Sequence, residues 1–155
     1  ATPRRTTIAR RLGIAARVAG ELRMLGMEVD VFEAGPGRPN VVGVLHGRHS
    51  GPALMFCGHT DTVGVTGMQR PFSPDIRDGR LFGRGAQDMK GGLAAMIGAA
   101  RLIVEEGGLE RGSLLVAAVA DEEHASLGAE ALVRHWHADA AVVTEPTGLD
   151  VAIAH

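Results

Sequence analysis

Short apolar runs of strand length alternate along this chain with longer segments of helical periodicity. The strand-like runs cover residues 28–32, 41–45, 53–57, 113–120, 140–143 and 151–154. Apolar side chains recur at helical spacing over residues 8–25, 89–106 and 127–135. This alternation predicts an α/β fold with a mixed, mostly parallel sheet flanked by helices.

Size and charge narrow the class of protein. A chain of 155 residues with 45% hydrophobic and 22% charged residues is suited to one ordinary core, so we expect one domain. Sixteen basic against eighteen acidic residues leave a net charge of −2, so we expect neither a nucleic acid nor a membrane as partner. The arginines at 4, 5, 10 and 11 are expected on one solvated helix face. The single cysteine, Cys57, excludes an intramolecular disulfide, and we expect the protein in the cytoplasm. Cys57 itself is expected to be a small buried apolar side chain.

Residues 62–85 are rich in glycine and proline and predict a long loop. Within it, Asp78-Gly79 is typical of a tight hairpin turn, and Leu81-Phe82 predicts a short strand after that turn. Long loops in compact domains are often functional.

Candidate ligands follow the predicted strands. His59 comes after the third strand, Glu122 and Glu123 after the run at 113–120, and Glu145 after the run at 140–143, while Asp88 precedes the long helix. In open α/β sheets, ligand sites lie beyond the carboxyl ends of the strands. Imidazole and carboxylate are the ligand chemistry of zinc, so these residues are candidates for a metal site.

Each candidate also has a simpler interpretation. His59 and Asp61 could form an ordinary turn pair, and Asp88 could cap the helix that follows. Glu122-Glu123 could be a solvated acidic turn before the helix at 127–135, and Glu145, before Pro146, has the same simpler interpretation. In the metal interpretation Asp61 orients the His59 ring, Asp88 bridges two cations, and one member of the glutamate pair acts as a general base. A dinucleotide interpretation of the glycines at 83 and 85 is disfavoured, because a phosphate would meet the Asp88 carboxylate.

Four motifs occur in order: GHTDTV at 58–63, GRGAQDMKGG at 83–92, DEEHASLG at 121–128 and TEPT at 144–147. Together they resemble the acetylornithine deacetylase and succinyl-diaminopimelate desuccinylase family of dizinc metallohydrolases. That family also includes aminoacylases and glutamate carboxypeptidases. The resemblance extends from about Gly26 to the end of the chain.

The resemblance implies a ligand set. His59, Asp88 and Glu145 would hold one zinc, and Asp88 and Glu123 the second, with cobalt or manganese as possible substitutes. Glu122 would be the general base, and Asp61 would be the carboxylate behind His59. A cis peptide after the bridging aspartate, here Asp88-Met89, is also implied.

The implied reaction is hydrolysis of the amide bond of an N-acyl amino acid or small peptide through a metal-bound water. Members of this family are longer, with a dimerisation domain and a further metal-binding histidine near the C-terminus. We therefore expect residues 1–155 to be the N-terminal part of a zinc-peptidase-like catalytic domain, weakly active or inactive alone and part of a homodimer in the full-length form. His155 is expected in the last strand rather than as that ligand.

Two alternatives stay open at this point: another co-catalytic zinc aminopeptidase, and an inactive fragment or non-catalytic module that binds metal or assists assembly. The first differs from the family in substrate, and the second predicts no hydrolysis. The remaining histidines are expected in exposed turns or helix ends, namely His46, His49, His135 and His137.

Overall fold

The computed structural model describes the backbone of residues 3–148 and the side chains of residues 11–148. The predicted strand at 151–154 and His155 lie outside the described residues. The elements in chain order are α1 (Pro3–Met24), β1 (Glu28–Gly35), β2 (Arg38–His46), β3 (His49–His59), β4 (Asp75–Arg77), β5 (Arg80–Phe82), the irregular helical turn η1 (Ala86–Gly91), α2 (Gly92–Glu105), β6 (Arg111–Val119), α3 (Leu127–His135) and β7 (Ala140–Val143).

Five strands form one mixed sheet in the order β1-β2-β6-β3-β7. β2 pairs antiparallel with both of its neighbours, whereas β3 pairs parallel with β6 and with β7. β2 therefore runs against the other four strands, and the predicted mixed sheet flanked by helices is confirmed. The register pairs His59 with Val119 and Cys57 with Val143, so β3, β6 and β7 end at the same edge.

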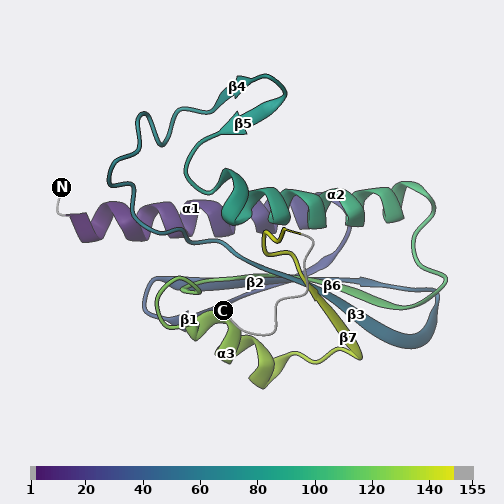
Figure 1. Cartoon of the computed structure of the whole chain (residues 1–155). Helices are drawn as coiled ribbons and strands as arrows, with labels where there is room; N and C mark the ends of the chain where they lie inside the picture. The colour runs from purple at the N-terminus through teal and green to yellow at the C-terminus, as the bar shows by residue number, and fades with distance from the viewer. Residues whose placement is uncertain (1–2, 149–155) are drawn as a thin grey trace.

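Helices cover both faces of this sheet, with α1 and α2 on one side and α3 on the other (Figure 1). Alternate residues of β6 divide between the two cores: Leu114, Val116 and Ala118 face α1 and α2, and Leu115 and Ala117 belong to the cluster that contains Leu132 of α3. This is the period-2 alternation of a strand buried on both faces. The sheet is thus the middle layer of three.

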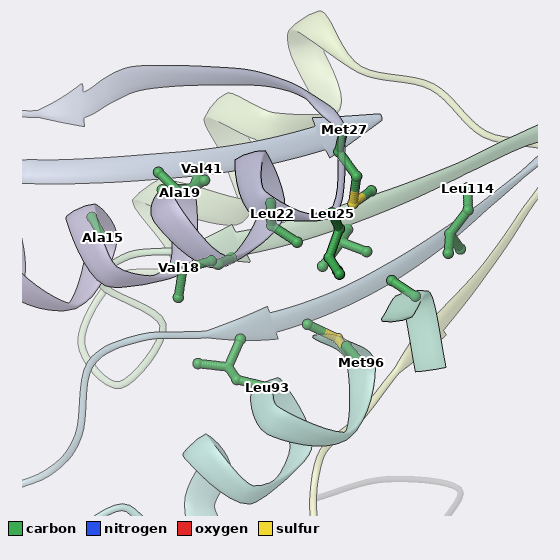
Figure 2. Close-up of a cluster of buried hydrophobic side chains, with 13 residues drawn as sticks. Ala15, Val18, Ala19, Leu22, Leu25, Met27, Val41, Leu93, Met96 and Leu114 are labelled. Carbon is green, nitrogen blue, oxygen red and sulfur yellow. The ribbon is translucent and has the colours of Figure 1, made fainter. Parts of the chain in front are cut away.

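The larger core lies between α1, the sheet and α2 (Figure 2). Ala15, Val18, Ala19 and Leu22 of α1 are at most 3% exposed, as their helical spacing predicts. Leu12 belongs to the same predicted stripe but remains 46% exposed. The buried stripe of α1, among the side chains described, therefore begins at Ala15.

The predicted loop at 62–85 forms an arm that extends beyond the body of the domain and carries the β4–β5 hairpin (Figure 1). Asp78 and Gly79 both have positive φ, 50° and 73°, at the hairpin turn. Positive φ at both central positions suits the twist of a two-residue hairpin, which explains the Asp-Gly pair. The predicted turn and short strand are confirmed.

The long helix predicted at 89–106 begins later than expected. The Asp88-Met89 peptide is cis, as the resemblance implied, and both residues have non-helical backbone angles. Regular α2 therefore starts at Gly92, and the irregular turn η1 carries Asp88 instead. Among residues 3–148, no helix combines the length and apolar character that a bilayer crossing requires.

Candidate metal centre

His59 is the last residue of β3 and is only 2% exposed. Its ring Nδ1 lies 3.0 Å from the backbone carbonyl of Asp61, and the nearer Asp61 carboxylate oxygen is 3.6 Å away. The carbonyl is therefore the direct partner of Nδ1. Contacts of this kind fix the orientation of a histidine ring and leave Nε2 for another partner.

Nε2 of His59 faces three carboxylates from three parts of the chain. Its distance is 2.9 Å to Asp88 Oδ1, 3.6 Å to Glu145 Oε1 and 3.8 Å to Glu122 Oε2. Single ligand atoms of His59, Asp88 and Glu145 all lie within 4.8 Å of one another. The side chains of Asp88 and Glu145 are 46% and 38% exposed, so an ion can reach the group from solvent.

Glu122 and Glu123 are held by their backbone. Their N–H groups donate to the two carboxylate oxygens of Asp61, each at 3.2 Å. Glu123 Oε1 accepts a hydrogen bond from the N–H of Val63 at 3.1 Å, and Glu123 lies outside the group of three. Asp61 thus links the His59 strand end to the turn that carries both glutamates.

The capping interpretations do not match the helix termini. The N-cap residues of α2 and α3 are Gly91 and Ser126, and neither terminus has a side-chain capping hydrogen bond. Asp88 contacts His59 instead, and Asp61 binds the glutamate turn. The acidic residues therefore converge on the imidazole rather than on helix ends.

The carboxylates dominate the electrostatics of His59. Burial lowers the pKa of His59, but the carboxylates of Asp61 and Asp88, at 3.6 and 2.9 Å from its ring nitrogens, and the charge of Glu145 outweigh it and raise that pKa to about 9. The pKa of Glu145 is raised by burial and by the charges of Asp88, Glu122 and Glu123. A set of acidic groups with one imidazole nitrogen at its centre is a donor set that a divalent cation fits.

Sequence reasoning missed the buried polar residues that support this edge. Asp121, two residues after the end of β6, is fully buried, and its Oδ1 accepts a hydrogen bond from Nε of Arg38 at 2.5 Å. Asn40 is also fully buried, accepting from the N–H of Ala120 and donating to the carbonyl of Gly128. An aspartate at the end of an apolar strand was the available signal for Asp121, but nothing local pointed to Arg38 as its partner.

His46, His49, His135 and His137 are exposed, as predicted. Cys57 is a free, half-buried thiol packed against the α3-side core. Burial, with the nearby charge of Glu145, raises the pKa of Cys57 to about 11. The predicted apolar role of Cys57 agrees with this environment.

Residues 55–154 match peptidase family M20/M25/M40. Over 150 residues the chain is 43% identical to a succinyl-diaminopimelate desuccinylase of Gluconacetobacter diazotrophicus, covering 89% of this chain and 38% of that protein. It is 38% identical over 146 residues to an N-formyl-4-amino-5-aminomethyl-2-methylpyrimidine deformylase of Bacillus subtilis, covering 90% and 34%.

Among solved structures, aminopeptidase PepT from Bacillus cereus is similar with a TM-score of 0.75 and 25% identity, covering 90% of this chain and 39% of that chain. The chain therefore spans little more than a third of the length of the relatives it matches.

Proposed function

Because the chain belongs to peptidase family M20/M25/M40, we propose that it supplies the zinc-binding part of a hydrolase that cleaves the amide bond of an N-acyl amino acid or small peptide. The observation that carries this proposal is the convergence of His59, Asp88 and Glu145 within 4.8 Å at the edge where β3, β6 and β7 end. Similarity to a desuccinylase and a deformylase, by their names, supports an acyl group as the part removed.

In this proposal His59 Nε2, Asp88 and Glu145 hold one zinc, and Asp88 shares a second with Glu123. Cobalt or manganese could take the place of zinc. When bound, the metal supplies a Lewis acid that lowers the pKa of water and polarises a carbonyl. The half-buried Asp88 lies next to the imidazole, which suits it to the shared position.

Two residues of the chain would handle protons and orientation. Glu122, 42% exposed and 3.8 Å from His59 Nε2, would take a proton from the attacking water and deliver it to the leaving amine nitrogen. Asp61 would fix the position of the glutamate turn relative to the His59 ring, because it contacts both. After taking that proton, Glu122 would be a neutral carboxylic acid, which can protonate the leaving amine nitrogen.

We extend the proposal to the whole protein. Residues 1–155 would be the N-terminal part of its catalytic domain, with little or no turnover alone. The full-length form would act as a cytoplasmic homodimer on small substrates.

Zinc content tests the proposal directly. The chain is loaded with zinc, desalted and measured by elemental analysis beside His59→Ala. We expect about one zinc or more per chain, lost in the variant, while His135→Ala as an exposed control keeps the metal. An absence of zinc in the unaltered chain, or equal retention in His59→Ala, would contradict the ligand assignment.

A further inference from the structure

A cavity of about 410 Å³ opens between α1, the segment that follows β3 and the irregular turn η1. Its apolar wall is made by Ile14, Val63, Val65 and Phe72. A volume of this size is in the range of pockets that hold small organic molecules. The apolar wall suits a ligand with a short hydrocarbon part.

The polar wall of the same cavity is predominantly cationic. Arg11, Arg84 and Lys90 line it, against one carboxylate, Asp61. The two Asp61 carboxylate oxygens already accept the N–H groups of Glu122 and Glu123. Three positively charged side chains and one negatively charged side chain therefore line the cavity, and this excess of positive charge favours an anionic ligand.

Arg84 has an unused donor in this wall. One of its terminal nitrogens donates to the backbone carbonyl of Gly64 at 2.8 Å, whereas its Nε is buried and has no hydrogen-bond partner among the described residues. A buried donor without an acceptor requires an explanation, and a bound oxyanion supplies one. The bond to Gly64 keeps the guanidinium in place for such a ligand.

Within the described part of the chain, the positive charges of Arg11 and Lys90 are also not closely paired with a carboxylate. Among the described side chains Arg11 pairs with Asp121 Oδ1 at 4.0 Å, and Arg38 lies closer to that same oxygen, at 2.5 Å. The Lys90 side chain makes no ion pair or hydrogen bond among the side chains described, residues 11–148, although the charges of Asp61, Asp88 and Glu123 act on its pKa. Gly85 leaves room for it, because a Cβ there would lie 2.9 Å from Lys90 Nζ.

We infer that this cavity binds a small organic carboxylate, with the oxyanion at Arg84 and Lys90 and the hydrocarbon part against Phe72, Val63 and Val65. The forked guanidinium matches a carboxylate, and the apolar wall distinguishes such a ligand from a bare inorganic anion. The inference does not depend on the proposed metal chemistry, because none of these contacts requires a metal.

Titration calorimetry on the metal-free 155-residue chain tests the inference, since without zinc the carboxylate cannot coordinate metal. The probes are 4-methylpentanoate, its uncharged analogue 4-methylpentanamide, and inorganic phosphate. We expect the carboxylate to bind at least tenfold more tightly than the amide or phosphate. Arg84→Met should weaken carboxylate binding about tenfold or more, and Arg101→Met, which removes an exposed arginine of α2, should leave it unchanged.

Circular dichroism melting shows whether Arg84→Met is folded. If it is not, Lys90→Gln takes its place, because it removes a cavity charge without touching the bond between Arg84 and Gly64. The inference is overturned if the unaltered chain does not bind 4-methylpentanoate, or if phosphate binds as tightly. Unchanged carboxylate affinity in a folded Arg84 or Lys90 variant would also overturn it.

Discussion

Histidines and acidic residues meet at both ends of the sheet, but they converge only at one. At the end where β3 begins, His46 Nε2 lies 3.5 Å from Glu28 and His49 Nε2 lies 3.4 Å from Glu110. All four of these side chains are at least 66% exposed. At the end where β3 stops, His59 is 2% exposed and faces Asp88, Glu122 and Glu145 together.

The difference teaches that an imidazole–carboxylate contact is not by itself a site. Water and salt screen an exposed pair, so each contact at the first end contributes little. At the second end burial weakens that screening, and several carboxylates act on one nitrogen. Convergence in a partly buried place separates the candidate metal centre from ordinary surface pairing.

The largest effect is expected from the buried ion pair behind the candidate centre. Arg38→Met leaves the Asp121 carboxylate buried without its closest partner, so we expect a loss of about 3–5 kcal/mol in the free energy of unfolding. Urea denaturation measures it. The matched change at the other end, Arg48→Met, removes an exposed pair with Glu110 and should cost less than about 0.5 kcal/mol. Similar losses in both variants would remove the distinction between the ends.

Zinc should stabilise one end of the sheet and not the other. At a zinc concentration of 100 times Kd, the free energy of unfolding should rise by about 2.7 kcal/mol, because only the folded chain brings the ligands together. Denaturation with and without zinc checks this. His59→Ala should abolish the increment and His49→Ala should preserve it. An increment that survives in His59→Ala would place the metal elsewhere.

Asp61→Asn tests whether the link between strand and turn matters for the metal. The change keeps the size of the side chain but removes the charge that accepts both glutamate N–H groups, so zinc affinity should fall about 10- to 100-fold. Competition with a chromophoric chelator measures the affinity. Asp139→Asn is the control, since Asp139 accepts an N–H bond from Ala53, far from the candidate centre. Equal affinities for Asp61→Asn and the unaltered chain would contradict the role of Asp61.

The smallest effect is expected where the exposed histidines lie. His46→Gln and His49→Gln should each change the free energy of unfolding by less than about 0.5 kcal/mol, because their partners are solvated. Thermal melts with and without zinc check both stability and metal response. A loss above 1 kcal/mol in either variant would mean that exposed pairs contribute more than their solvation suggests.

Local pattern was sufficient for much of the fold. Periodicity located the elements of the sheet and its helices, and Asp78-Gly79 located the hairpin turn, because these features depend on neighbouring residues. The rule that ligand sites lie beyond the carboxyl ends of strands correctly predicted that His59 and Glu145 lie at the same edge of the sheet. The functional roles of these residues stay predictions.

Local sequence pattern could not predict which residues distant in the chain would pair. Arg38 and Asp121 are 83 positions apart in the chain, and the residues around either one do not indicate that the two form an ion pair. Arg11 was expected on a solvated face, but it is 25% exposed and lines the cavity, because the segment after β3 lies near α1. Composition records how many charges a chain has, whereas only the three-dimensional arrangement decides which of them are offset.

The position of β7 at the outer edge of the sheet has a consequence for biosynthesis. Among the described strands β7 pairs with β3 alone, and Glu145 follows β7 near the end of the described residues, long after His59 and Asp88. A ribosome delivers these residues in that order, and domains fold as their segments emerge. The three-residue group can therefore assemble only after β7 has docked beside β3, later than the described strands that precede β7 in the chain.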